Sequence, residues 1–447
     1  MRKFSTLLFF FLIDSISLLA YDAEIDGIYY KFSGEEAIVT YREQYSKEDY
    51  TGDVVIPEYV TYEGNEYCVT EIGRNAFYNC SNMKSISIPA SIIRIADWSF
   101  YGCTNLTAVK VPRSVRSIGY SAFAECENLV SVDISEGVEY IGRNAFEQTL
   151  WYNNQSDGLV YIGKVAYKYK GEMPEGTVII IKEGTKGITE EAFRNCSGLS
   201  SISIPKSVNN IGYSLFTSCP RLTSIRIEQG NSVYDSRNDC NAIIEISTSF
   251  LIAGCHNSTI PDDVVRIGDF SFTGCAALTS IAIPEGVKSV GFHAFEGCTE
   301  LKSIVIPNSV AEIETSAFHY CCGLTSVTLG KGITSIESGA FEECQSLSSV
   351  VCYAENPPVC GGLAFVVGPR RKCTLYVPYN SIEAYKNANV WKSFTEIKNI
   401  TEIGTAIASS LGESGEGCII YDLQGRRMVN GLAKGIHIQN GKKISIK

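Results

Sequence analysis

Histidine is scarce in this sequence, with only four in 447 residues, and none stands in a spacing that catalytic or metal sites use. There is no H-E-x-x-H pair, no Cys/His zinc spacing and no G-x-S-x-G turn. Neither a G-x-x-x-x-G-K-[ST] phosphate loop nor a G-x-G-x-x-G loop after a strand is present. We therefore expect no catalytic residues, no metal and no cofactor, and we predict that the protein is not an enzyme.

Positive charge is also in the minority, with 38 Lys and Arg against 49 Asp and Glu and a net charge of −11. Such a chain has no general attraction to phosphate backbones, so nucleic acid is not expected as a partner. The apolar run from Leu7 to Ile13 is far shorter than the roughly 20 residues that a membrane span needs. We interpret residues 1–20 as a signal peptide, with a membrane anchor as the weaker alternative.

What the sequence does contain is a repeat of 23 residues. The unit can be written C-x-x-L-x-S-I-x-I-P-x-x-V-x-x-I-G-x-x-A-F-x-x. A short run that alternates between polar and apolar residues and stops at proline predicts a strand. A period of 20–29 residues around such a strand is the leucine-rich-repeat signature, because one coil buries its apolar residues only by stacking on others. The anchoring phenylalanines are Phe77, Phe100, Phe123, Phe146, Phe193, Phe216, Phe272, Phe295, Phe318, Phe341 and Phe365.

The period is interrupted near residues 147–177 and 231–260, and each interruption contains a hairpin pattern. Residues 159–162 and 165–168 flank a Gly-Lys turn, and residues 242–246 and 250–253 flank a Ser-Thr-Ser turn. We predict a mainly β, right-handed leucine-rich-repeat solenoid of 23-residue coils with inserted β-hairpins and coils about 4.8 Å apart. The predicted divisions are a signal peptide at 1–20, an N-terminal β cap at 21–66, the solenoid at 67–352, a C-terminal cap at 353–400, a linker at 401–417 and a small β tail at 418–447.

The motif IGxxAFxxCxxLxxIxIPxSV resembles the BspA-like leucine-rich repeats of surface proteins from Gram-negative anaerobes. The insert YDSRNDCNAIIEISTSFLIAGCHNSTIP and the stretch WYNNQSDGLVYIGKVAYKYKG also resemble segments of that family, as do the flanks EIDGIYYKF and LYVPYNSIEAYKNANVWKSFTEI. The resemblance covers nearly all of the chain after residue 20. It implies secretion or display on the surface of a Gram-negative bacterium and an adhesin-like role, but it defines no binding residues.

The C-terminal segment adds a second, shorter resemblance. IYDLQGRR followed by KGIHIQNGKK resembles the C-terminal sorting tails of type IX-secreted proteins, which implies association with the outer surface through the tail. In such tails Tyr commonly follows KGI, whereas His437 stands here. Two or three short strands are expected, with turns at Gly425 and Asn440-Gly441. A small β module without an export role is the alternative.

Seventeen cysteines in a secreted chain would ordinarily indicate disulfides. Nine of them recur three residues after the anchoring phenylalanines, and Thr149 replaces the cysteine after Phe146. Parallel Cα–Cβ bonds in adjacent coils keep the Cβ atoms near 5 Å apart, whereas a disulfide needs about 3.8 Å. We predict that these nine are buried free thiols acting as small apolar residues. The pairs Cys240–Cys255 and Cys360–Cys373 are the disulfide candidates.

Two sets of residues are candidates for ligand binding. On each strand, side chains alternate inward and outward, and the second outward position varies from coil to coil on a constant scaffold. The alternative for this strand face is a solvated surface without a partner. The candidate strand-face residues are Lys110, Asp133, Ser203, Arg226 and Thr328.

The second set is the aromatic cluster of the first insert, Trp151, Tyr152, Tyr161 and Tyr167. Aromatic residues on a projecting loop suit protein or sugar contacts, but they equally suit packing of the hairpin onto the coil below. The predicted function is a surface-displayed binding protein for an extracellular protein or glycan. A structural envelope or biofilm protein without a discrete ligand is the alternative, and a carbohydrate-acting enzyme comes third because no catalytic constellation supports it.

Overall fold

The computed structural model describes residues 20–42, 50–365 and 373–402, together with three short strands nearer the C-terminus. The chain divides into two compact units, residues 1–155 and 156–447, and each is described by itself below. The boundary falls inside the first predicted insert. Among the described residues only Leu150–Asn153 (α1) and Ile382–Asn387 (α2) are α-helices. None of the described helices is long and apolar enough to cross a bilayer.

Most regular coils contribute strands to two separate sheets, whereas the coil from Cys275 to Phe295 contributes only the short strand Ser289–Val290 (β24). The x-S-I-x-I segment forms a long strand that ends at or before the proline position, because proline cannot donate to the ladder. The two residues that end in the Ile of I-G form a second, short strand on another side of the coil. The sequence predicted only the long strand, since two residues are too few to show an alternation. The predicted fold class, a mainly β leucine-rich-repeat solenoid, is confirmed.

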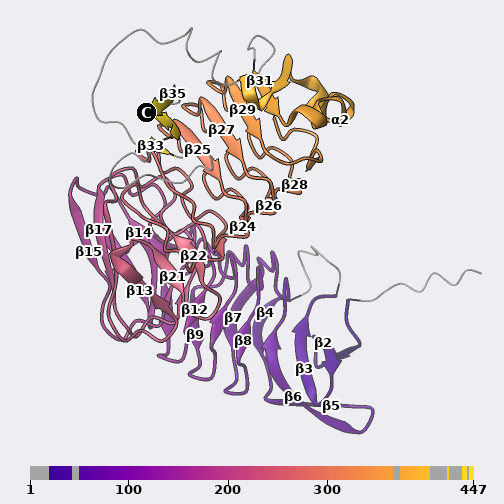
Figure 1. The fold of residues 1–447 in the computed structure, drawn as a ribbon. Coiled ribbons are helices and arrows are strands. Elements are labelled where there is room, and N and C mark those ends of the chain that lie inside the picture. Colours follow the sequence, from indigo (N-terminus) through magenta and orange to yellow (C-terminus); the bar gives the residue numbers. More distant parts are fainter. Residues whose placement is uncertain are drawn as a thin grey trace, which may run out of the picture. The chain divides into compact units, whose positions relative to one another are not determined.

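In the first unit, parallel pairs of long strands follow one another along the chain (Figure 1). They are Gly52–Val55 (β4) with Met83–Ser87 (β7), and Ala108–Val111 (β9) with Ser131–Ile134 (β11). The short strands Arg94–Ile95 (β8), Ser117–Ile118 (β10) and Tyr140–Ile141 (β12) form one row, which continues from the end of the eight-residue strand Asn65–Ile72 (β6). The N-terminal end of this row is covered by Ala23–Ile25 (β1), Ile28–Ser33 (β2), Glu36–Thr40 (β3) and Tyr59–Tyr62 (β5).

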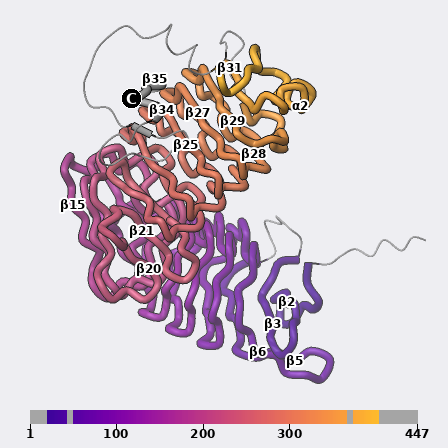
Figure 2. Tube along the Cα trace, in the orientation of Figure 1, coloured from indigo at the N-terminus to yellow at the C-terminus, as the bar shows by residue number. Residues whose placement is uncertain are grey.

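In the second unit, the long strands form two parallel sheets. These are Thr177–Ile180 (β15), Leu199–Ile204 (β17) and Ser224–Ile227 (β19), then Ser303–Ile306 (β25), Ser326–Leu329 (β27), Ser349–Cys352 (β29), Thr374–Val377 (β31) and Glu396–Asn399 (β32). The short-strand rows contain Gly187–Ile188 (β16), Asn210–Ile211 (β18), Arg266–Ile267 (β23), Ser289–Val290 (β24), Glu312–Ile313 (β26), Ser335–Ile336 (β28) and Val359–Cys360 (β30). The tube in Figure 2 follows these coils from one to the next.

Both predicted hairpins are present, and each is built into a row of short strands. Gly158–Ile162 (β13) pairs antiparallel with Val165–Lys170 (β14), and β14 continues parallel into β16. Ile243–Glu245 (β21) pairs antiparallel with Phe250–Ala253 (β22), and β22 continues into β23. Tyr234–Asp235 (β20) and the 3₁₀ turn Arg237–Asp239 (η1) precede the second hairpin. The hairpins therefore replace part of a coil and do not project from between coils.

The second strand of each hairpin reaches the position that an anchoring phenylalanine fills elsewhere. In regular coils the backbone N–H of the anchoring phenylalanine donates to the carbonyl oxygen of the residue that precedes the anchoring phenylalanine of the next coil. Phe318 N, for example, donates to Ala340 O at 2.8 Å. Tyr169 N donates in the same way to Ala192 O at 2.9 Å, and Gly254 N to Ser271 O at 2.8 Å. A Cβ at Gly254 would lie 2.2 Å from the Phe272 ring, so this anchor position must be glycine.

Stacked phenylalanine rings form the centre of each core. Adjacent rings from Phe77 to Phe146 have centroids 4.8–5.3 Å apart, and those from Phe272 to Phe365 lie 4.9–5.1 Å apart. These spacings match the predicted separation of coils. The Phe193 and Phe216 rings are further apart, at 6.1 Å, next to the second hairpin. Most of these side chains are completely buried, so each contributes about 2–3 kcal/mol of hydrophobic stabilisation.

Two residues in each regular coil have a left-handed backbone. One stands two residues before the anchoring phenylalanine and the other two residues after it, where the next residue is the ladder cysteine or, after Phe146, Thr149. Asn, Ser and Gly are frequent at both, because they adopt positive φ at lower cost than bulky residues. The first set is Asn75, Trp98, Ser121, Asn144, Glu191, Ser214, Phe270, His293, Ser316 and Gly339. The second set is Asn79, Gly102, Glu125, Gln148, Asn195, Ser218, Gly274, Gly297, Tyr320 and Glu343.

The C-terminal cap closes the last coil with aromatic residues. Trp391 and Tyr385 are completely buried, and Trp391 Nε1 donates to Pro358 O at 2.8 Å. The Tyr385 hydroxyl donates to Ala354 O at 2.9 Å, so both polar atoms are satisfied inside the cap. The cap contains α2 and the 3₁₀ turns Tyr379–Ser381 (η2), Trp391–Ser393 (η3) and Ile400–Glu402 (η4).

The predicted tail contains three antiparallel strands, Ile420–Tyr421 (β33), Gly435–Gln439 (β34) and Lys442–Ile446 (β35). The signal peptide, most of the linker and the predicted turns at Gly425 and Asn440-Gly441 lie outside the described residues.

Replacement of one anchor tests the stacked core. Phe318→Ala removes a completely buried ring that stacks on two neighbours, so we expect a loss of about 3–5 kcal/mol in the free energy of unfolding. Urea denaturation measures the loss, and Phe318→Leu should cost much less because it retains most of the volume. A loss below about 1 kcal/mol for the alanine variant would contradict the stacked core.

Candidate functional site

The strand face is built from the outward residues of the long strands. In the first unit Lys110 lies opposite Asp133 in the register of β9 and β11, and both are exposed. The inward neighbours of Lys110, Val109 and Val111, are buried, and those of Asp133, Val132 and Ile134, are half-buried, so the inward residues orient the strands while the outward residues stay in solvent. This pair is the only oppositely charged pair among the five predicted strand-face residues.

The remaining strand-face candidates lie in the second unit. Ser203 is half-buried and lies opposite the exposed Arg226 in the register of β17 and β19. Thr328 is half-buried between Val305 and Val351 of neighbouring strands. All five residues occupy outward positions as the alternation predicts. Their role in binding stays a prediction.

The aromatic insert divides into buried and half-buried residues. Tyr152 and Tyr167 are buried, with 6% and 1% exposed, which supports the packing alternative for both. The Trp151 ring packs on Phe146 at 5.4 Å, and Thr149 caps α1 by accepting a hydrogen bond from Tyr152 N at 3.0 Å. Tyr161 is half-buried and holds the Lys182 ammonium 4.2 Å from its ring centroid. Only Trp151 and Tyr161 therefore remain partly available to a ligand.

The ladder cysteines are buried free thiols, as predicted, but they do more than fill space. Cys321 Sγ donates to the Phe295 oxygen of the preceding coil at 3.1 Å, and Cys298 N donates to the same oxygen at 3.2 Å. The thiol thus satisfies a second acceptor site on a buried carbonyl. Equivalent thiol bonds are made by Cys103, Cys126, Cys219, Cys298 and Cys344.

The same burial makes the ladder thiols poor nucleophiles. Burial raises the thiol pKa of Cys321 well above its usual value, and it raises those of Cys196, Cys275 and Cys344 to about 12. The thiolate is the reactive form, so very little of it is present near neutral pH. A catalytic role for the ladder is therefore disfavoured.

The four predicted disulfide cysteines are free thiols in this structure. Cys240 Sγ contacts Ala242 O at 3.7 Å and Cys255 Sγ contacts Asn241 O at 3.6 Å, so each thiol points to a main-chain acceptor. Burial raises the pKa of Cys360 and Cys373 to about 12. Neither pair is bonded here, and pairing under oxidising conditions stays a prediction that mass mapping of the intact protein tests.

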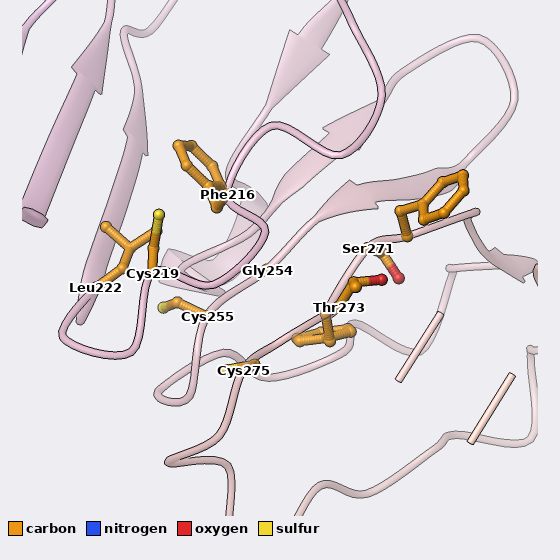
Figure 3. A pocket seen from close by; sticks show the side chains of 10 residues that line it. Phe216, Cys219, Leu222, Gly254, Cys255, Ser271, Thr273 and Cys275 are labelled. Carbon is orange, nitrogen blue, oxygen red and sulfur yellow. The ribbon is translucent and has the colours of Figure 1, made fainter. Parts of the chain in front are cut away.

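A small cavity lies where the phenylalanine stack is interrupted by the second hairpin. It is lined by Phe216, Phe272 and the thiols of Cys219, Cys255 and Cys275, and Figure 3 shows these thiols on neighbouring segments. Its volume is about 10 Å³, which admits about one water molecule. A substrate or cofactor does not fit there.

Two histidines meet at one carboxylate on the side of the second unit. His293 Nδ1 lies 2.7 Å from Glu296 Oε2, and His319 Nδ1 lies 3.3 Å from Glu296 Oε1. His319 Nε2 lies 4.0 Å from Glu342 Oε2. In the part of the chain that the structure describes, no three His, Cys, Asp or Glu side chains are grouped so that they could hold a metal ion. The contacts of His319 with Glu296 and Glu342 join neighbouring coils, whereas His293 and Glu296 belong to the same coil.

Adjacent cysteines provide a matched test of the thiol ladder. Iodoacetamide should alkylate the half-buried Cys322 well before Cys321, because Cys321 is completely buried and its thiol pKa is raised. Mass spectrometry of peptides quenched over time measures the two rates, and both cysteines should react equally once the chain is unfolded. Equal rates in the folded protein would show that the ladder is not closed to solvent.

Residues 70–173, 160–253 and 247–358 match the BspA type leucine rich repeat region (6 copies), which spans well over half of the chain. A search of the curated proteins finds no match.

Several solved bacterial structures are similar at low identity. A leucine rich cell surface protein from Faecalibacterium prausnitzii is 24% identical, with 75% of this chain and 95% of that chain covered and a TM-score of 0.38. The pneumococcal vaccine antigen PcpA is 18% identical, with coverages of 86% and 99% and a TM-score of 0.40. A leucine-rich repeat protein from Eubacterium ventriosum is 22% identical, with coverages of 84% and 92% and a TM-score of 0.40. On the evidence of its repeats and of the family match, the chain belongs to the BspA-type leucine-rich-repeat family.

Proposed function

We propose that the protein is a non-catalytic binding protein located outside the cell, which uses its coiled scaffold to present a variable surface to an extracellular protein or glycan. The observation that carries this proposal is that most inward residues of the long strands are buried, whereas most outward residues are exposed or half-buried. Inward residues such as Val109 and Val111 are buried, whereas the outward residues Lys110, Asp133 and Arg226 are exposed and differ from coil to coil. Repeat scaffolds bind partners through extended surfaces of this kind.

Location outside the cell is supported by the family and by the apolar run that follows two basic residues at the N-terminus. Display on a Gram-negative bacterium and attachment through the C-terminal tail belong to the same proposal, because the tail resembles type IX sorting signals. The protein would then meet host or neighbouring-cell surfaces directly, as an adhesin does.

The strand face is tested by binding measurements on the full chain. We expect saturable binding to at least one member of an array of extracellular-matrix proteins, plasma proteins and glycans. The variants Lys110→Gln/Asp133→Asn and Arg226→Gln are compared separately, because the two sites lie in different units. Loss of about tenfold or more in affinity in either variant locates the ligand on the strand face, since tenfold corresponds to about 1.4 kcal/mol and only the minority of interface residues that dominate binding cost more than about 1 kcal/mol.

Arg94→Gln provides the matched control, because Arg94 is an exposed cation on a short strand and not on the strand face. It should bind like the unmodified protein. If a folded sample binds nothing on the array, the binding role is rejected in favour of a structural envelope role. If binding is saturable but none of the strand-face variants weakens it, the strand face is not the binding surface.

A further inference from the structure

The first unit carries an aromatic residue at a backbone position that is poorly suited to one. The residue before the Ala-Phe or Ser-Phe pair has positive φ in all four coils, and it is Asn75, Trp98, Ser121 or Asn144. Asn and Ser tolerate this conformation, whereas a bulky residue pays about 1–2 kcal/mol for it. Trp98, with φ of 52°, is the bulky residue among the four, and Phe270, with φ of 56°, holds the equivalent position in the second unit.

The anchor of the same coil does not require an aromatic residue at this position. The core of the same coil is filled by Phe100, which is completely buried, whereas Trp98 is only half-buried on the side of the coil. The neighbouring coils fold with Asn or Ser at the equivalent position. In the second unit Phe270 makes the corresponding edge-on contact with Phe292 at 5.3 Å, so the neighbouring arginines, and not the backbone angle, set Trp98 apart.

Trp98 belongs to a row of rings and guanidinium groups that crosses four coils. The Arg74 guanidinium lies 4.4 Å from the centroid of the Trp98 ring, and Trp98 meets the Tyr120 ring edge-on at 5.1 Å. The Arg143 guanidinium lies 5.2 Å from the centroid of Tyr120. We call these four residues the aromatic flank. Trp, Tyr and Arg are also the residue types that dominate binding energy at protein interfaces.

Arg74 is exposed, and among the described residues it has no carboxylate partner. A guanidinium stacked on a ring keeps its N–H groups pointing outward in its own plane, where they can take both oxygens of a carboxylate. The row therefore offers an aromatic surface with an oriented carboxylate receptor at one end.

We propose that the aromatic flank binds an acidic polypeptide segment of a partner protein, with Arg74 receiving a carboxylate and Trp98 and Tyr120 packing against the adjacent chain. The cation contacts favour a polypeptide over a stacked sugar. A pyranose ring would need an uncovered ring face, whereas Arg74 and Arg143 already lie against the faces of Trp98 and Tyr120. This assignment rests on the proposed binding function and names a second surface for it, distinct from the strand face.

The test uses the full chain with poly-L-glutamate as the probe and isothermal titration calorimetry as the readout. We expect saturable binding that weakens at least tenfold in Trp98→Asn and in Arg74→Gln. Trp98→Asn introduces the residue that neighbouring coils already have at this backbone position, so its melting temperature should equal or exceed that of the unmodified protein. Asn144→Ser, at the equivalent position two coils further on, is the matched control and should bind normally.

Four results would overturn the proposal. They are the absence of saturable binding to poly-L-glutamate, unchanged binding by Trp98→Asn, a melting temperature of that variant lowered by several degrees, and equally tight binding of polygalacturonate. The last would assign the flank to an acidic saccharide, and the lowered melting temperature would make Trp98 a packing residue. If the protein binds an array ligand through the strand face but does not bind poly-L-glutamate, the proposed function stands and only this inference is rejected.

Discussion

The structure depends on the exact superposition of one coil on the next at the Phe-x-x-Cys turn. At this turn the backbone N–H of the anchoring phenylalanine donates a hydrogen bond to the following coil. The backbone carbonyl of the same phenylalanine accepts a hydrogen bond from the cysteine N–H of its own coil, and in six coils it also accepts one from the cysteine thiol of the following coil. A buried carbonyl left without partners would cost about 1–3 kcal/mol. The coils therefore keep their Phe-x-x-Cys turns in register: most are 23 residues long, and the coil from Phe341 to Phe365 accommodates one extra residue while its rings still stack at 5.0 Å.

The sequence predicted the features that recur in register. The phenylalanine and cysteine columns identified the solenoid, and turn residues identified both hairpins. It missed the short strands, because a two-residue strand has no visible alternation. It also missed that Tyr169 and Gly254 occupy anchor positions in the hairpin coils. Counted from the residue that pairs with the Ile of the next short strand, these coils reach the anchor position in two residues fewer than regular coils do.

The candidate site was predictable to the extent that it follows strand alternation. Lys110, Asp133 and Arg226 are exposed as expected, because the inward residues fix which way the strand faces. The aromatic insert was less predictable, since the sequence does not tell a projecting ring from Tyr167 in the core. Trp98 was overlooked because it is unusual only in comparison with Asn75, Ser121 and Asn144 once their positive φ angles are known.

Hydrogen–deuterium exchange of the full chain tests most directly whether the anchor turns hold the coils together. The account predicts that the amides of Phe100, Phe295 and Phe318 are among the slowest to exchange, since each donates at 2.7–2.8 Å to the next coil inside the core. The exposed turn at Gln229 and Gly230 provides the fast reference. Anchor amides that exchange as fast as this turn would show that the stacking of Phe-x-x-Cys turns is not what stabilises the coils.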